Sequence, residues 1–347
     1  MTATTSTSAD RTPAALPVPL WNRHLAVLAA ATVLLVPLPL VLPDAYQAVA
    51  VRVLVFALLS IGWNIMSGFG GMFSFGHAAY FGLGAYTEVW LLVELGVPPW
   101  IGMGVGMVVA AAFAVLVGFL ALRYRLKGAY FALATFAFAE MLRLWAISSD
   151  VVNRAQGYHV PLRPEPSWWY LQFEPGAPEY FWIALGLTAF AVVVTVLFLR
   201  TRTGQFAVAA RDDEDAAAAL GVPVMRVKLT TMAVSAAIAS VAGAFYVQYY
   251  LFVDPDLAFG SAVSIQAILP AVIGGVATLW GPVLGAVVLG PLSDVTATLL
   301  RNPPAPLEFL HGRGGLDVVL YGVLLILILR LLPKGIYGTV REWWERR

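Results

Sequence analysis

Residues 53–87 read VLVFALLSIGWNIMSGFGGMFSFGHAAYFGLGAYT and contain no charged side chain. A helix needs about 20 mostly apolar residues to cross a bilayer, so this stretch is too long for one crossing. Four glycines gather near its centre, and glycine weakens regular helix. The stretch therefore predicts two membrane helices that are separated by a break at Gly68–Gly76.

The composition also indicates a membrane protein. Of the 347 residues, 60% are hydrophobic and 12% are charged, whereas soluble domains average about 45–50% and about 25%. The absence of cysteine excludes disulfides, thiol chemistry and cysteine-ligated metals. We therefore predict an all-α, polytopic membrane protein.

Further apolar runs of membrane-crossing length recur along the chain. The run Leu257–Ser293 is again too long for one helix and should divide near Trp280-Gly281-Pro282. With both long runs divided, the sequence predicts about ten membrane-spanning helices. The other runs are Leu25–Pro43, Pro98–Leu122, Gly128–Ser148, Phe181–Leu199, Leu229–Val253 and Leu316–Leu332.

Basic residues set the expected orientation, because lysine and arginine accumulate on the cytoplasmic side of membrane proteins. Placing Arg123, Arg125 and Lys127 inside makes the loop 201–228 cytoplasmic and the segment 150–180 external. Both the N and C termini then lie in the cytoplasm. The predicted organisation is a disordered cytoplasmic tail at 1–22, a transmembrane domain at 23–335 and a cytoplasmic tail at 336–347.

Small residues recur at every fourth position in two of the predicted spans. Such rows let helix backbones approach closely in lipid, although a chain rich in alanine and glycine also produces them by chance. We expect both rows to be packing faces. They are Gly102, Gly106, Ala110, Ala114 and Gly118 in one span, and Ser235, Ala239 and Gly243 in the other.

The stretch QFAVAARDDEDAAAALG, residues 205–221, gathers five consecutive charged residues at 211–215. Its alanines favour one helix over Gly204–Leu220, which Gly221 and Pro223 should end. Three interpretations compete: a solvated connector, an Asp-rich Mg²⁺ site for a diphosphate substrate, or a helix that docks on a partner protein. The DDxxD spacing of diphosphate-binding enzymes would need an acid at Ala216, which disfavours the second.

Part of this loop resembles a known family. Asp215-Ala216-Ala217 followed by Gly221 is similar to the EAAxxxG loop of ABC-importer permeases, with Asp in place of Glu. The surrounding loop resembles that of the branched-chain amino acid permease family. Three further stretches resemble the same family in the same order: Gly68–Tyr86, Lys127–Arg143 and Ala233–Val288.

The resemblance implies an inner-membrane permease whose cytoplasmic loop docks on an ATP-binding subunit. It also implies a second homologous permease subunit, two ATP-binding subunits and an extracytoplasmic solute-binding protein. ATP and Mg²⁺ would be used by the partners, with no cofactor in this chain; no GxxxxGK[ST] loop occurs in it. The coupling residues would be Arg211, Asp212, Asp213, Glu214, Asp215, Ala216, Ala217 and Gly221.

Branched-chain amino acids are the first substrate that the resemblance implies, followed by urea, short amides or small organic acids. The family usually opens its external segment with a TGG-type motif, whereas this chain has Asn153-Arg154-Ala155-Gln156-Gly157. That departure leaves the substrate open.

The glycine-rich break offers two interpretations. Non-helical backbone at membrane depth survives only where protein or a water-filled cavity satisfies it, so Ser74, Gly76 and His77 would line a substrate path. Alternatively, the segment is a plain cytoplasmic turn with His77 at the interface. Of the other polar residues near spans, Glu140 and Arg143 should form a structural pair, whereas Glu88 is expected at an interface.

Two other functions stay open from the residues themselves: a secondary transporter driven by an ion gradient, and an integral-membrane transferase. The chain offers no nucleophile–base pair and no metal cluster, since its four histidines are scattered and none forms HExxH. We therefore expect a transporter that is not an enzyme.

Overall fold

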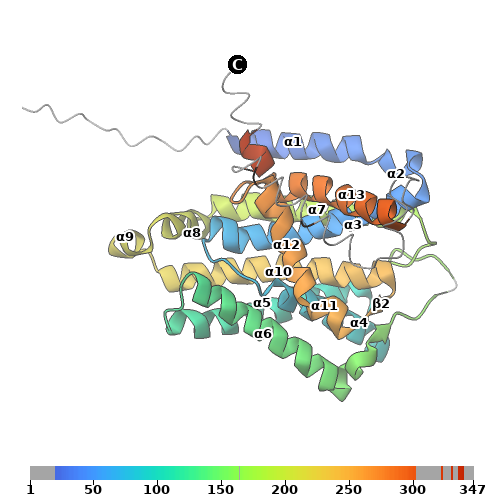
Figure 1. Cartoon of the computed structure of the whole chain (residues 1–347), viewed down its shortest axis with the longest axis horizontal. Coiled ribbons are helices and arrows are strands. Elements are labelled where there is room, and N and C mark those ends of the chain that lie inside the picture. Colours follow the sequence, from blue (N-terminus) through green and yellow to red (C-terminus); the bar gives the residue numbers. More distant parts are fainter. Residues whose placement is uncertain (1–19, 164, 302–321, 323–329, 331–334, 340–347) are drawn as a thin grey trace, which may run out of the picture.

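The long apolar runs of the sequence form helices that lie side by side in the computed structural model (Figure 1). It describes residues 20–163, 165–301, 322, 330 and 335–339. The α-helices are α1 (Leu20–Leu35), α2 (Leu38–Val41), α3 (Asp44–Trp63), α4 (His77–Leu95), α5 (Pro99–Arg123), α6 (Ala129–Ser148), α7 (Pro178–Arg200), α8 (Arg202–Asp212), α9 (Glu214–Ala219), α10 (Val224–Tyr250), α11 (Pro255–Phe259), α12 (Ser261–Gly274) and α13 (Gly281–Arg301).

Short elements complete the described part of the chain, which is mostly helical and confirms the predicted all-α class. Both predicted breaks are present, at residues 70–76 and 275–280. The short elements are the π-helix η1 (Asn64–Phe69), the 3-10 helices η2 (Asp150–Val152) and η3 (Arg154–Gln156), and the strands β1 (Tyr158–His159) and β2 (Phe252–Val253).

Seven stretches of the described residues are long and apolar enough to cross a membrane. The expected span Leu316–Leu332 and most of the expected tails 1–22 and 336–347 lie outside the described residues. The seven stretches are His24–Val41, Asp44–Phe69, Pro99–Arg123, Ala129–Ser148, Pro178–Arg200, Val224–Tyr250 and Pro255–Gly274.

Helix α10 packs against α3, α4 and α5 and forms the centre of the bundle. Its glycine allows a very close approach, because a Cβ on Gly243 would lie 1.9 Å from the carbonyl oxygen of Phe81 in α4. A Cβ on Gly84 of α4 would lie 2.0 Å from the carbonyl oxygen of Ser240. All members of the two predicted small-residue rows are buried, which confirms them as packing faces.

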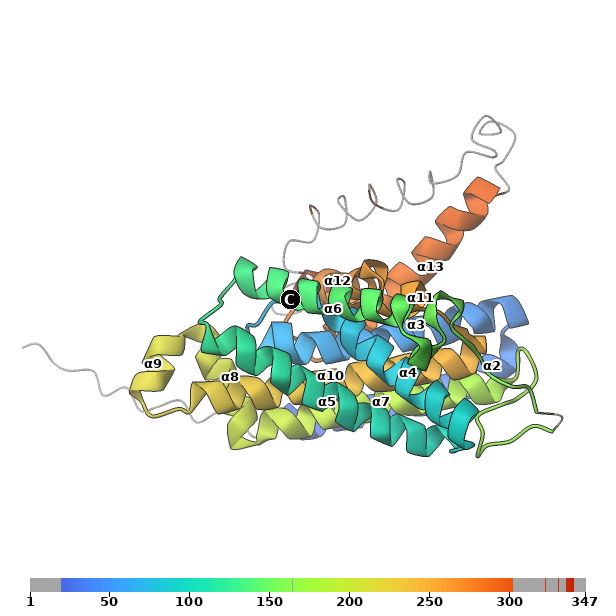
Figure 2. The same cartoon turned by 90° about the horizontal axis from the view of Figure 1, so that it is seen from below.

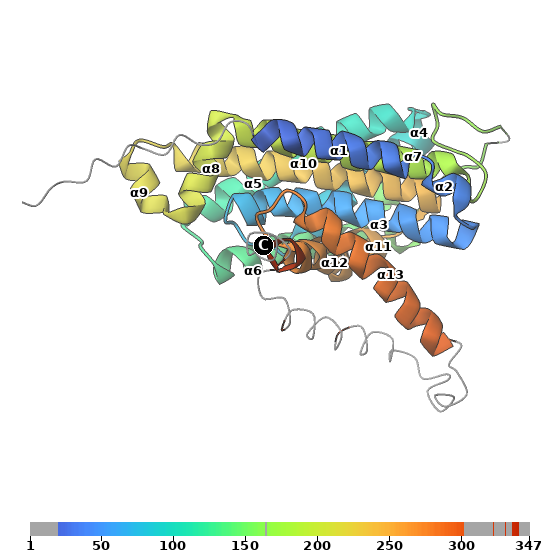
Figure 3. The ribbon, with the colours of Figure 1, turned by 90° about the horizontal axis from the view of Figure 1, so that it is seen from above.

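The two ends of the bundle differ. Helices α8 and α9 project from one end, at the left in Figure 1 and again in Figure 2; we refer to it as the α9 end. The opposite end carries the antiparallel pair β1–β2, in which Tyr158 lies opposite Val253; we refer to it as the sheet end. Helix α1 lies against α7, and α13 leans away from the bundle (Figure 3).

The charged residues within the predicted spans have polar partners. Arg143 donates from Nε to Glu140 Oε1 at 3.0 Å and from Nη1 to Asp256 Oδ1 at 2.6 Å, so the expected structural pair is present. The expectation that Glu88 lies at an interface is wrong: its side chain is buried and accepts a 2.7 Å hydrogen bond from Gln248 Nε2. The physical reason is that α10 supplies a polar partner, which the position of Glu88 near a helix end does not reveal.

Replacing Gly243 with alanine is expected to destabilise the protein by about 1–3 kcal/mol, because the added methyl group meets the backbone of α4. Thermal unfolding in detergent measures the effect. Gly186→Ala is the matched control, since nothing lies within 4 Å of the added atom; it should be neutral or stabilising by about 0.5–1 kcal/mol. Equal melting temperatures for the two variants would contradict the packing.

Candidate functional site

The charged loop at the α9 end contains two helices, so the expectation of one helix over Gly204–Leu220 is wrong. Asp213 separates α8 from α9, with φ −153° and ψ 109°. Its Oδ1 accepts hydrogen bonds from the backbone N–H groups of Asp215 at 3.0 Å and Ala216 at 2.9 Å. Asp213 is therefore the N-cap of α9, and this capping competes with continuation of α8.

Two of the five clustered charges contact other parts of the chain. Arg211 donates from Nη2 to Asp212 Oδ1 at 2.7 Å and from Nη1 to the Gly68 carbonyl oxygen at 3.4 Å. Glu214 Oε2 lies 2.8 Å from Lys228 Nζ and 3.3 Å from Lys127 Nζ. Burial alone would raise the pKa of Glu214, but its hydrogen bonds and ion pairs with the two lysines outweigh burial and lower that pKa.

The end of α9 presents an apolar side chain to solvent. Gly221 has φ +85°, a left-handed conformation that glycine adopts without strain. The N–H of Gly221 donates to the Ala218 carbonyl and that of Val222 to the Ala217 carbonyl, which is the Schellman arrangement expected of a helix stop. Leu220, just before this turn, is 87% exposed. The sequence analysis did not single out Leu220, although a leucine beside a helix-ending glycine was visible.

The glycine-rich break begins as a π-helix and continues as extended chain. After η1, residues 70–76 run from the α9 end toward the middle of α10, where α4 begins at His77. Side chains replace the missing helical hydrogen bonds. Ser67 Oγ donates to the Met72 carbonyl at 3.0 Å, and Thr135 Oγ1 of α6 accepts from the Phe75 N–H at 3.3 Å.

Ser74, Gly76 and His77, the expected path residues, are all buried within the chain. The Ser74 carbonyl accepts from Trp63 Nε1 at 2.8 Å, and Ser74 Oγ accepts from the Gly76 N–H at 3.0 Å. His77 Nε2 lies 3.0 Å from Ser235 Oγ near the middle of α10, while its Nδ1 has no hydrogen-bond partner among the described residues. His77 thus lies inside the bundle and not at its surface.

Alternate residues of the extended segment face outward. Phe73 and Phe75 are 40% and 38% exposed, while Met72, Ser74 and Gly76 are buried. The two phenylalanine rings contact each other edge to face with centroids 5.2 Å apart. The sequence analysis missed these two residues; the alternation of aromatic and small side chains over Phe73–Gly76 was the available signal.

The two helix breaks meet at Asn64. Its Oδ1 accepts from the Ala277 N–H at 2.9 Å, and its Nδ2 donates to the Thr278 carbonyl at 2.8 Å. A Cβ on Gly68 would lie 2.1 Å from Asn64 Oδ1, so glycine is required where the breaks touch. Nothing in the sequence linked Asn64 to residues more than 200 positions away.

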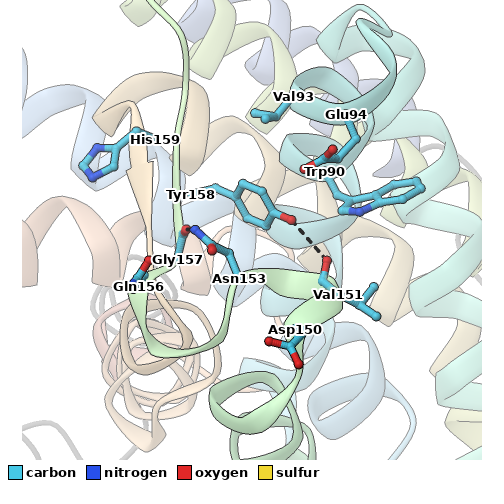
Figure 4. A pocket seen from close by; sticks show the side chains of 10 residues that line it. All are labelled: Trp90, Val93, Glu94, Asp150, Val151, Asn153, Gln156, Gly157, Tyr158 and His159. Carbon is cyan, nitrogen blue, oxygen red and sulfur yellow. Dashed lines mark hydrogen bonds between the residues drawn. The ribbon is translucent and has the colours of Figure 1, made fainter.

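An open cavity of about 710 Å³ lies at the sheet end (Figure 4). Trp90 and Glu94 from the last turns of α4 line one side of it, and the segment that follows α6 lines the other. Asn153 Nδ2 donates to the Gly157 carbonyl at 2.6 Å, and the Tyr158 hydroxyl donates to the Val151 carbonyl at 3.1 Å (Figure 4). Burial and the nearby charge of Glu94 raise the pKa of Tyr158.

Comparison with known proteins decides the family. The family described as "Branched-chain amino acid transport system / permease component" matches residues 45–329. The chain belongs to this family. The matched region includes the extended segment 70–76 and the loop with α8 and α9. Both of these candidate sites therefore lie in the part of the chain that the family covers.

Several relatives are similar to this member of the family. It is 28% identical to the high-affinity branched-chain amino acid transport system permease protein LivM of Escherichia coli K12 over 337 residues, which cover 90% of this chain and 75% of LivM. It is 26% identical to the permease protein LivH of Salmonella typhimurium over 300 residues, which cover 82% of this chain and 91% of LivH. No solved structure matches the chain.

Replacing Asp213 with alanine is expected to speed hydrogen exchange at the Ala216 amide about five- to thirtyfold, because a lost N-cap costs about 1–2 kcal/mol. Asp213→Asn keeps an oxygen acceptor and should stay near the wild-type rate. Asp212→Asn, a charge change one position away that leaves the cap in place, is a second control. Unchanged exchange in the alanine variant would contradict the capping role.

Proposed function

We propose that this chain is the permease subunit of an ABC importer that moves branched-chain amino acids across the inner membrane. The observation that carries the proposal is the family match over residues 45–329, supported by the similarity to both LivM and LivH. The substrate rests on the names of these relatives, and the chain itself is proposed to catalyse no reaction.

We propose about ten spans with both termini in the cytoplasm. The seven membrane-length stretches, α4 and α13 would supply nine of them, and Leu316–Leu332 would be the tenth. Basic loop residues gather at the α9 end, which favours a cytoplasmic position for that end. They are Arg123, Arg125, Lys127, Arg200, Arg202, Arg226 and Lys228.

The proposed complex contains a second homologous permease subunit, two ATP-binding subunits and an extracytoplasmic solute-binding protein. ATP and Mg²⁺ act in the ATP-binding subunits. The cavity beside Trp90 and Glu94 opens at the sheet end, where the solute-binding protein would dock. Similarity to two differently named permease proteins supports the pairing of homologous permease subunits.

The loop with α8 and α9 is the proposed contact with the ATP-binding subunits. It projects beyond the bundle (Figure 1) and offers exposed Asp212, Asp215 and Leu220. An exposed leucine at the tip of a projecting loop suits the anchor of a protein interface, because burial of one leucine contributes about 1.5–3 kcal/mol.

The extended segment 70–76 is the proposed wall of the substrate path. Non-helical backbone does not face lipid, so the exposed side of Phe73 and Phe75 must meet water or another protein. Aromatic rings offer an apolar surface to an aliphatic amino-acid side chain. Ser74 and His77 lie buried behind them, and we propose that the His77 Nδ1, which has no hydrogen-bond partner among the described residues, contacts the solute when the path opens.

Charge reversal at Asp212 and Asp213 together is expected to lower solute transported per ATP hydrolysed at least tenfold, because it removes the α9 cap and reverses the proposed contact surface. Reconstituted complexes in proteoliposomes provide the measurement. Charge reversal at Glu165 and Glu174, which are exposed at the sheet end, should leave binding of the ATP-binding subunits unchanged. Wild-type assembly and coupling in the Asp212/Asp213 variant would refute the docking role.

Alanine at Ser74 or His77 is expected to reduce uptake about tenfold, since loss of one proposed hydrogen bond to the solute, about 1–1.5 kcal/mol, corresponds to that factor. Initial uptake rates at several solute concentrations separate weaker binding from slower transport. Thr195→Ala is the control, because this buried threonine bonds only to its own helix at the Ala191 carbonyl. Uptake kinetics that match the control would exclude these residues from the path.

A further inference from the structure

Arg211, at the end of α8, packs on the beginning of the extended segment. Its side chain is only 30% exposed although it lies in a projecting loop. The Cγ atom lies 2.6 Å from the position that a Cβ on Gly71 would occupy, and Nη1 reaches the Gly68 carbonyl at 3.4 Å. The proposed docking helix therefore touches the proposed path wall directly.

Gly71 is adapted to this contact in two ways. Its φ of +69° lies in the left-handed region, and any side chain there would strike the aliphatic part of Arg211. The chain thus turns sharply under Arg211 before it continues toward Phe73. If Arg211 is displaced, either this turn moves with it or the contact between Arg211 and Gly71 is broken.

A second route connects the same loop with the far end of the extended segment. Glu214, the first residue of α9, pairs with Lys127 just before α6. Thr135 Oγ1 of α6 accepts a hydrogen bond from the Phe75 N–H, and a Cβ on Gly76 would lie 2.5 Å from the Thr135 carbonyl oxygen. The segment is therefore held at both ends by elements that contact α8 and α9.

The extended segment is held by side-chain hydrogen bonds, from Ser67, Trp63 and Thr135, and not by a continuous helical ladder. Helices α4 and α10 are locked by backbone contacts at Gly84 and Gly243, and close-packed interiors deform little. Residues 70–76 have no helical ladder of hydrogen bonds to break. A push from α8 would therefore change the position of Phe73 and Phe75 before it changes the helices.

We infer that Arg211 is the positioning residue that transmits movement of the ATP-binding subunits to Phe73 and Phe75, through its contact with Gly68 and Gly71. The inference rests on the proposed function and adds the path that the movement takes inside this chain. Arg211 acts within the chain, while Asp212, Asp215 and Leu220 face the partner.

The chain contains no cysteine, so Phe73→Cys introduces a single thiol that reports on the path wall. In the complete complex, maleimide labelling of this thiol is measured without nucleotide and after trapping with ATP and vanadate. We expect the labelling rate to change at least threefold on trapping. Arg211→Ala, which removes both the Cγ atom that lies on Gly71 and the guanidinium that reaches Gly68, should reduce that change below 1.5-fold, while Arg202→Ala at the exposed start of α8 should preserve it.

Gly71→Ala provides an independent test of the same contact. We expect solute transported per ATP to fall at least fivefold, and Arg211→Ala in the same chain to lower it less than twofold further, because both changes disrupt the same contact. Gly96→Ala is the control, because Gly96 has φ +66° but nothing within 4 Å, so it isolates backbone strain from the clash.

The possible results separate the inference from the proposed function. A nucleotide-dependent labelling change that persists in Arg211→Ala, or Gly71→Ala and Arg211→Ala defects that multiply in the double variant, would overturn the link alone. A labelling rate that does not respond to nucleotide even with Arg211 intact would overturn the proposed path wall together with the link.

Discussion

Lipid cannot hydrogen-bond to the backbone, and this constraint governs the most unusual part of the structure. Each unsatisfied N–H or C=O group in hydrocarbon costs several kcal/mol, so a break in a membrane helix needs replacement partners. Here side chains supply several of the partners, beside backbone bonds such as that from the Met72 N–H to the Met66 carbonyl. Ser67 both donates to the Met72 carbonyl and accepts from the Ser74 N–H, and Trp63 and Thr135 complete the set.

These replacement bonds tie the break to its surroundings. Thr135 belongs to α6 and His77 bonds to Ser235 of α10, so the break is held between two helices that are distant in sequence. Asn64 ties it in turn to the second break at residues 277–278. Two helix interruptions therefore lie against each other at Asn64.

The charged loop divides its residues between two tasks. Arg211 and Glu214 contact the body of the chain, Asp213 caps a helix, and Asp212 and Asp215 remain exposed. Charged residues that are consecutive in the sequence therefore have different contacts in the structure. The ion pair between Glu214 and Lys228 involves a lysine side chain that is only 11% exposed, so it positions α9 more firmly than a fully solvated pair would.

The sequence by itself determined the all-α membrane class, both helix breaks, the small-residue packing rows and the helix stop at Gly221. Each of these depends on local composition or spacing: apolar runs of membrane length, small residues at every fourth position, and a glycine after an alanine-rich helix. Tertiary structure alone decided that Glu88 is buried against Gln248, that Asp213 divides the charged loop, and that Arg211 lies on Gly71. The contacts of Glu88 and Arg211 join residues that are 140 or more positions apart in the sequence. The division at Asp213 depends on competition between an N-cap and continuation of a helix. The spacing of neighbouring residues encodes neither effect.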